Sequence, residues 1–227
     1  MGSKSDIDRG SPLSSPIRRN RVWFSVQVIL RLVFTFWLRY RARGIEKIPK
    51  IGGGLLLINH QSYLDPLLIG LPLDRPVSYL ARETLFPVPF VGWLLRSTYV
   101  MPINREAASP TSIKEAVRRL KHGFLVGVFP EGTRTRDGSV GQFKPGFIAL
   151  IRRAKLPVYP VGIAGANEAF PRGKWLLRPR KVRVVFGDPF NSAEIEELSK
   201  RGQEEKLVAL CRSRVIQCYQ EAAKLLE

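Results

Sequence analysis

Residues 54–66 read GLLLINHQSYLDP, and this stretch decides the fold class. It opens at Gly54 with an apolar run that ends at Asn59, which is typical of a strand buried on both faces of a sheet. A polar segment follows at once, and Pro66 favours the start of a helix directly after Asp65. The end of a buried strand, where a helix begins, is the place where α/β folds bind their ligands.

The alternation of strand and helix continues along the chain. Apolar runs bounded by Gly or Pro predict further strands at residues 77–81, 99–103, 124–129, 158–163 and 181–186. Helices are predicted at residues 112–123, 146–154 and 191–227, the last of them with a break near Gly202. We therefore expect an α/β fold with a mostly parallel sheet that is flanked by helices.

The charge balance narrows the possible partners. The chain of 227 residues carries 37 Lys and Arg against 19 Asp and Glu, which gives a formal net charge of +18. Hydrophobic residues make up 44% of the chain, and this fraction excludes an intrinsically disordered protein. So positive a charge predicts an anionic partner, which can be nucleic acid, a membrane surface, or an acidic substrate or carrier. The two histidines and two cysteines form no zinc pattern, so we expect no metal.

An apolar segment lies inside the basic N-terminal part of the chain, at residues 22–38 (VWFSVQVILRLVFTFWL). On a helical wheel Gln27 and Arg31 fall in one half, while most aromatic and aliphatic residues fall in the other. The segment is close to the shortest membrane span, contains a central arginine and has arginines at both ends. We therefore expect an amphipathic helix that lies in the interface of an anionic leaflet, or that dips into the leaflet and returns. A spanning helix and a helix of the protein core remain the alternatives.

Three segments are expected along the chain. Residues 1–16 are rich in Ser, Gly and Pro and are predicted to be a mobile tail. Residues 17–44 form the N-terminal membrane-associating segment, and residues 45–227 form the α/β domain. A second basic run occupies residues 172–183, with Trp175 inside it and no acidic residue. This run is either a solvated loop or a further surface for lipid headgroups or an acidic carrier.

His60 and Asp65 are the first candidates for chemistry. A neutral imidazole can take a proton from a hydroxyl near neutral pH, and it does so better when a carboxylate holds its other nitrogen. On one continuous helix, residues five apart would point about 140° away from each other, so pairing needs a turn between them. Pro66 favours such a turn. The alternative is that Asp65 only caps the helix that follows it.

A second candidate site is the turn FPEGTRTRDG at residues 129–138, directly after a predicted strand. Arg134 carries a fork of donors suited to phosphate, and Gly132 permits a tight backbone approach. Glu131 can accept hydrogen bonds from a polyol or simply pair with an arginine, and Thr133 adds a hydroxyl. Further cations follow other strands or loops, and they form one anion pocket if the sheet brings the strand ends together; an ordinary turn is the alternative. The cations concerned are Arg105, Arg134, Arg136 and Lys144.

These motifs together resemble those of the glycerolipid acyltransferases, most closely the branch of the 1-acyl-sn-glycerol-3-phosphate (lysophosphatidic acid) acyltransferases. Residues 59–66 resemble the first motif of this family, NHxxxxD. Residues 129–134 match the third motif, FPEGTRS, with Thr135 in place of the usual Ser. Residues 101–105 resemble the second motif, which ends in an arginine, and residues 158–163 resemble the fourth. All four occur in the family's order over roughly residues 40–190, and the third is the most specific of them.

The resemblance implies an enzyme that moves a fatty acyl group from a thioester to the sn-2 hydroxyl of lysophosphatidic acid, giving phosphatidic acid. It implies that His60 is the base and that Asp65 orients it. It also implies that the Gly132 N–H stabilises the oxyanion and that no cofactor is needed, since acyl-coenzyme A or acyl carrier protein is a co-substrate. The residues that it assigns to the acceptor are Arg105 and Arg134 for the phosphate, Glu131 and Thr133 for the glycerol region, and Lys144 as a further contact.

Several expectations about binding partners and cellular location follow. We expect binding to anionic membrane lipids, at the cytoplasmic face of a bacterial inner membrane, and no specific nucleic acid. A different lysolipid, such as a lyso-ornithine lipid, is the alternative acceptor, because relatives share these motifs. A catalytically inactive lipid-binding protein and a nucleic-acid-binding module are more remote alternatives.

Overall fold

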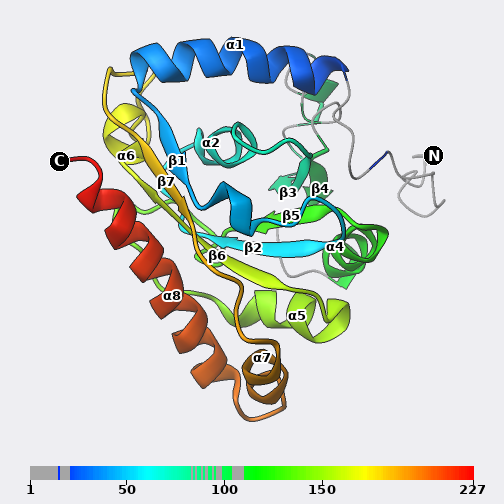
Figure 1. Ribbon diagram of the computed structural model, residues 1–227. Coiled ribbons are helices and arrows are strands. Elements are labelled where there is room, and N and C mark those ends of the chain that lie inside the picture. Colours follow the sequence, from blue (N-terminus) through cyan, green and yellow to red (C-terminus); the bar gives the residue numbers. More distant parts are fainter. Residues whose placement is uncertain are drawn as a thin grey trace.

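The computed structural model describes residues 15, 21–82, 84, 86, 87, 89, 92, 93, 95, 99–103 and 110–227. The predicted mobile tail, Ser15 apart, and Arg105 lie outside these residues. Within the described part of the chain, seven strands form one sheet in the order β1-β7-β6-β2-β5-β3-β4 (Figure 1). The strands are β1 (Arg41–Arg43), β2 (Gly54–Ile58), β3 (Val77–Arg82), β4 (Met101–Ile103), β5 (Leu125–Val128), β6 (Val158–Ala164) and β7 (Arg183–Phe186).

The sheet is mostly parallel, as expected. The run β6-β2-β5-β3-β4 is parallel throughout, whereas β7 pairs antiparallel with β6 and carries β1 beside it. The sheet begins at Arg41, before the expected start of the α/β domain at residue 45. The strand expected at residues 99–103 starts only at Met101, because Tyr99 has a φ of 66°, which does not fit a strand.

Helices cover both faces of this sheet (Figure 1). Along β2, Leu56 and Ile58 enter one core and Leu55 and Leu57 enter the other, because successive strand side chains point to opposite faces. The first core contains residues of α1 (Arg21–Trp37), α2 (Asp65–Gly70) and α6 (Ala166–Ala169). The second contains residues of α4 (Pro110–His122), α5 (Ile148–Ala154), α7 (Ser192–Leu198) and α8 (Glu204–Lys224). Short 3₁₀ turns lie at η2 (Ile45–Lys47) and η4 (Pro145–Phe147).

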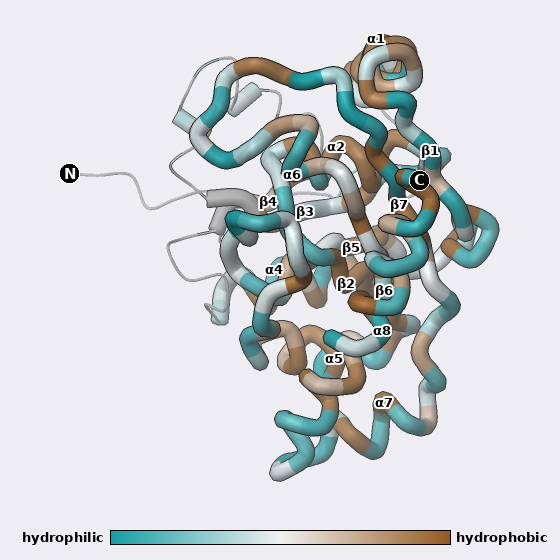
Figure 2. Tube along the Cα trace, turned by 90° about the vertical axis from the view of Figure 1, so that its left-hand side faces the viewer, coloured by the Kyte–Doolittle hydropathy of each residue, from teal (hydrophilic) through white to brown (hydrophobic). Residues whose placement is uncertain are grey.

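Helix α1 packs on the protein with a side that carries Gln27 and Arg31 between the buried rings of Trp23 and Phe34. The Gln27 amide donates to the Gly70 and Leu73 carbonyls at 2.8 and 3.0 Å, and Arg31 donates to the Leu71 carbonyl. These carbonyls lie at and beyond the C-terminal end of α2, where a helix leaves its last carbonyls without intrahelical partners. The outward side of α1 is apolar, and much of the helix is coloured as hydrophobic in Figure 2. Its exposed members are Phe24, Val28, Ile29, Leu32, Val33, Phe36 and Trp37.

The helices were predicted to include one near the N-terminus that associates with a membrane, so their length and hydropathy matter. Among the residues that the structure describes, no helix combines the length and hydropathy that crossing a bilayer requires.

Candidate active site

The catalytic candidates lie at the carboxyl edge of the parallel strands. Asn59 directly follows β2, and its buried side chain bridges to β6: the amide nitrogen donates to the Ile163 carbonyl at 3.0 Å, and the amide oxygen accepts from the Ile163 N–H at 2.7 Å. The Asn59 side chain therefore replaces the backbone hydrogen bonds between β2 and β6 at the point where the chain leaves the sheet. This fixes the point at which the chain leaves the sheet and enters the turn that carries His60.

The turn brings His60 and Asp65 together. Nδ1 of His60 lies 2.7 Å from Oδ2 of Asp65, and the N–H groups of Gln61 and Ser62 donate to the same oxygen at 2.7 and 2.8 Å. Asp65 is 0% exposed, whereas the His60 side chain keeps 19% of its surface open. Burial raises the pKa of the Asp65 carboxyl, and the hydrogen bonds from His60, Ser62 and Gln61 oppose that rise. The pair is thus a fixed, partly accessible imidazole on a buried carboxyl group.

The turn after β5 holds His60 by its backbone. Oε1 of Glu131 accepts the His60 N–H at 3.0 Å, and the Thr135 N–H and hydroxyl donate to the His60 carbonyl at 2.9 and 3.3 Å. The Phe129 ring stacks on the imidazole, with centroids 4.2 Å apart and planes 24° apart. Because β2 and β5 are parallel neighbours, their ends meet at one edge and the two motifs interlock.

Glu131, expected to contact the glycerol region, lies against the turn that carries His60. It is buried, at 4% exposure, and its carboxyl contacts the backbone of His60. Burial raises the pKa of Glu131 from its ordinary 4.5 to about 7, opposed by the N–H groups of His60 and Gly141. One oxygen of the carboxyl, Oε1, thus holds the His60 turn.

Replacing Glu131 with Gln should flatten the pH dependence of stability. A carboxyl with a raised pKa in the fold stabilises the protein fully below the unfolded pKa of 4.5 and loses this effect as the pH rises through about 7. Between about pH 5.5 and about pH 8 the free energy of unfolding of the wild type should therefore fall about 2 kcal/mol more than that of Glu131→Gln. Urea unfolding at both pH values measures this. An equal fall in the free energy of unfolding for the two proteins between these pH values would contradict the prediction.

Arg134 lies beside the turn that carries His60. Its guanidinium carbon stands 3.4 Å from the centre of the Tyr63 ring, which is a stacked cation–π contact. Its Nη1 is buried, and no hydrogen-bond partner for this nitrogen is found within the described ranges. A positive donor group that is held flat and lacks a partner suits an anionic ligand.

The other predicted contacts differ in what they can do. The Gly132 N–H donates to the Phe129 carbonyl at 3.0 Å, which corrects the expectation that it serves the oxyanion: the tight turn already uses this donor. Gly132 has a φ of 69°, and a Cβ there would lie 3.3 Å from Nζ of Lys144, so glycine lets the lysine approach. Thr133 and Arg136 are exposed at the surface.

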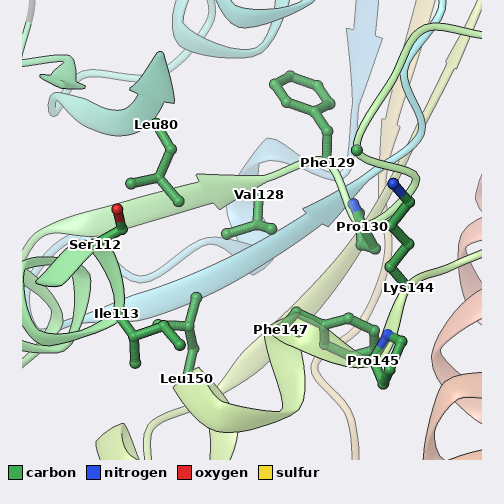
Figure 3. A pocket seen from close by; sticks show the side chains of 12 residues that line it. Leu80, Ser112, Ile113, Val128, Phe129, Pro130, Lys144, Pro145, Phe147 and Leu150 are labelled. Atoms are coloured by element: carbon green, nitrogen blue, oxygen red, sulfur yellow. The ribbon is translucent and has the colours of Figure 1, made fainter. Parts of the chain in front are cut away.

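An apolar cavity of about 520 Å³ opens beside Phe129 (Figure 3). It lies on the face of the sheet that α4 and α5 cover, and Lys144 stands at the Phe129 end while Ile113 and Leu150 line the far end. Its remaining wall is mostly aliphatic and aromatic. The full lining is Leu80, Ser112, Ile113, Val128, Phe129, Pro130, Gly132, Lys144, Pro145, Gly146, Phe147 and Leu150.

Three residues of this site were not assigned roles from the sequence. They are Asn59, Tyr63 and Phe129, and all lie inside the first and third motifs. Their position there is the only signal that the sequence offered. Their tasks depend on the neighbouring strand, which the sequence does not identify.

Comparisons with known proteins identify the family. The acyltransferase family model matches residues 39–164, a range that includes both motifs. A 1-acyl-sn-glycerol-3-phosphate acyltransferase of Pseudomonas aeruginosa is 34% identical over 201 residues, which cover 82% of this chain and 76% of that protein. Another, of Bacillus subtilis, is 29% identical over 73% of this chain and 79% of its own length. The crystal structure of the 1-acyl-sn-glycerophosphate (LPA) acyltransferase PlsC from Thermotoga maritima has a TM-score of 0.68 and 27% identity, covering 89% of this chain and 83% of that one.

Proposed function

Because the chain belongs to the acyltransferase family, in the branch of the 1-acyl-sn-glycerol-3-phosphate acyltransferases, and is therefore an enzyme, we propose that it acylates the sn-2 hydroxyl of lysophosphatidic acid to give phosphatidic acid. The observation that carries this proposal is the His60–Asp65 pair at 2.7 Å, flanked by an apolar cavity and a partly buried arginine. The acyl donor is a thioester of coenzyme A or of acyl carrier protein, which is a co-substrate. The proposed chemistry needs no cofactor.

The reaction follows from the position of the imidazole. The Asp65 carboxylate accepts a hydrogen bond from Nδ1–H and holds the proton on that nitrogen, so the Nε2 lone pair can take the proton of the acceptor hydroxyl. The hydroxyl oxygen attacks the thioester carbonyl carbon, and a tetrahedral oxyanion forms. When the carbon–sulfur bond breaks, the thiolate leaves and receives the proton that His60 has held. No acyl-enzyme is formed, because the hydroxyl attacks the thioester directly.

The substrates divide between the two sides of His60. The acyl chain enters the apolar cavity beside Phe129, where burial of its methylenes favours binding. Lys144 stands at the mouth of this cavity and is our candidate for stabilising the oxyanion in place of the Gly132 N–H. The acceptor phosphate lies on Arg134. Arg105, which lies outside the described residues, and Thr133 remain proposed as further acceptor contacts.

The Tyr63–Arg134 stack gives a selective prediction. Tyr63→Ala should raise KM for lysophosphatidic acid about fivefold, because the guanidinium loses a contact worth about 1 kcal/mol that holds it in place. Tyr63→Phe retains the ring and serves as the matched control. Steady-state kinetics with each substrate varied in turn measure this. KM for the thioester should not change in either variant, and KM for lysophosphatidic acid should rise only in Tyr63→Ala. An equal loss in both variants would contradict the stacking role.

The outward face of α1 supports a place at the membrane. A helix that turns seven large apolar side chains outward is unfavourable in water and typical of an interface with lipid. Arginines at both ends of the segment favour an anionic leaflet. We propose that the protein lies on the cytoplasmic face of a bacterial inner membrane, where both substrates can reach His60.

Acceptor-dependent thiol release tests the proposed function. The wild type is given palmitoyl-coenzyme A or palmitoyl-acyl carrier protein, with lysophosphatidic acid in mixed micelles, and the product is identified by mass spectrometry. Thiol release that requires the acceptor and yields phosphatidic acid supports the proposal. Lyso-ornithine lipid is the competing acceptor. Acylation of this lipid alone, or no transfer from either donor, would overturn it.

A further inference from the structure

The loop between α6 and β7, residues 171–181, carries an exposed apolar tip inside a basic frame. Trp175 is 98% exposed and Leu176 is 75% exposed, so neither side chain takes part in the core. The residues around them are cationic, and the loop contains no acidic residue. The exposed cations are Arg172, Lys174, Arg178 and Arg180.

The base of this loop is fixed to the body of the protein. The Arg178 N–H donates to the Ala169 carbonyl at 2.8 Å and closes the loop. The side chain of Leu177 packs against the first core, while the neighbouring tip residues point outward. The loop therefore presents Trp175 and Leu176 from a defined place.

That place is next to α1. The Trp37 indole N–H, near the end of α1, donates to the Leu177 carbonyl at 3.0 Å. Figure 1 shows the loop beside this end of α1, and Figure 2, turned by 90°, again shows both at the same end of the molecule. The loop and α1 thus lie together at one end of the protein.

We propose that residues 171–181 are a second membrane contact, which rests with α1 on the surface of one anionic bilayer. Trp175 and Leu176 enter the interfacial region, and the surrounding Lys and Arg side chains reach the lipid phosphates. This deepens the proposed function and rests on its placement at a membrane. Two separated contacts fix the orientation of the carboxyl edge against the bilayer, which a single helix does not.

The chemistry of the loop favours a bilayer over an acidic carrier protein. A carrier needs cations but offers no reason for two nearly fully exposed apolar side chains at the tip. A bilayer accepts both, with tryptophan at the depth of the headgroups and cations beside it. The adjoining apolar face of α1 needs the same partner.

Vesicle binding without substrate tests this contact independently of acyl transfer. The vesicles contain phosphatidylcholine with or without phosphatidylglycerol, and binding is measured by co-sedimentation. The tip variant is Trp175→Ser with Leu176→Ser. The charge variant is Arg172→Gln, Lys174→Gln and Arg180→Gln. Its matched control, with the same loss of charge, is Lys200→Gln, Arg201→Gln and Lys206→Gln, near α7 and the start of α8, at the end opposite α1 (Figure 1).

The proposal predicts a distinct pattern across these proteins. The tip variant should lose about tenfold in partitioning to the anionic vesicles, since two apolar side chains leave the bilayer. The charge variant should lose about fivefold for each cation, and only on anionic vesicles. The control should lose much less, because its cations lie at the end of the molecule opposite α1, away from the proposed bilayer contact, where salt screens their attraction to the lipid. The rate of acyl transfer should be unchanged in the tip variant when both substrates are kept below their critical micelle concentrations.

Two results would overturn the proposal. One is vesicle binding equal to that of the wild type in both loop variants, which would make the loop an ordinary solvated segment. The other is a loss confined to turnover of acyl carrier protein thioesters with unchanged vesicle binding, which would assign the loop to an acidic carrier. Neither result would affect the assignment of acyl transfer to His60.

Discussion

His60→Ala is expected to lower kcat for acyl transfer by about 10³–10⁴-fold, because the hydroxyl then meets the thioester without a base. KM for both substrates should change much less than kcat, since the Arg134 guanidinium stacks on Tyr63 and the cavity keeps its aliphatic walls when the Phe129 ring loses its contact with the imidazole. The measurement is acceptor-dependent thiol release. His122→Ala is the matched control: this exposed histidine ends α4 and stacks near Phe124, so its loss should leave kcat unchanged.

Two further readings make the His60 result interpretable. Circular dichroism and vesicle binding should match the wild type, which separates a lost base from a lost fold. Thiol release by His60→Ala at the wild-type rate would show that another group takes the proton, and the mechanism proposed above would then be wrong.

Asp65→Asn should cost about 10³-fold in kcat while the protein remains folded. The asparagine oxygen can still accept from the Gln61 and Ser62 N–H groups, which Asp65 holds at 2.7 and 2.8 Å. A neutral amide, however, does not stabilise the imidazolium that forms when His60 takes a proton, and it favours the wrong ring tautomer. Steady-state kinetics together with urea unfolding test both parts.

Asp65→Ala provides the contrast to the amide. Here the two backbone N–H groups lose their buried acceptor, which costs about 1–3 kcal/mol for each group in the free energy of unfolding. Both variants should therefore be inactive, but only the alanine variant should unfold markedly earlier. An asparagine variant with wild-type kcat would remove Asp65 from the mechanism.

The alternation of strands and helices could be predicted from the sequence, because each buried strand shows its own local apolar pattern. The run GLLLI at β2 is apolar on both faces and bounded by glycine and a polar turn, and helices cover both of its faces in the structure. β1 could not be predicted, since RAR has no strand pattern of its own and exists only through its pairing with β7. The sequence shows that Gln27 and Arg31 share one side of α1. It does not show that this side faces the protein, because that depends on the carbonyls near the end of α2 that accept their hydrogen bonds.

The active site divides in the same way. His60 and Asp65 stand five residues apart in one turn, so their pairing follows from local geometry. The contacts from Glu131 and Thr135 to the His60 backbone link segments that are about seventy residues apart. Nothing in the sequence states that β2 and β5 are neighbours, so a carboxylate with an ordinary substrate role was the simpler interpretation of Glu131.

The clamp on the His60 backbone also sets a fixed spacing inside the enzyme. Thr135, which donates to the His60 carbonyl, is the residue directly after Arg134, so the backbone links the proposed proton acceptor directly to the proposed phosphate anchor. Neither can shift without the other to suit a longer or shorter alcohol. The distance between phosphate and hydroxyl in the acceptor is therefore gauged by the protein backbone, and an analogue with one more methylene between these groups should be a poor substrate however well its tail fits.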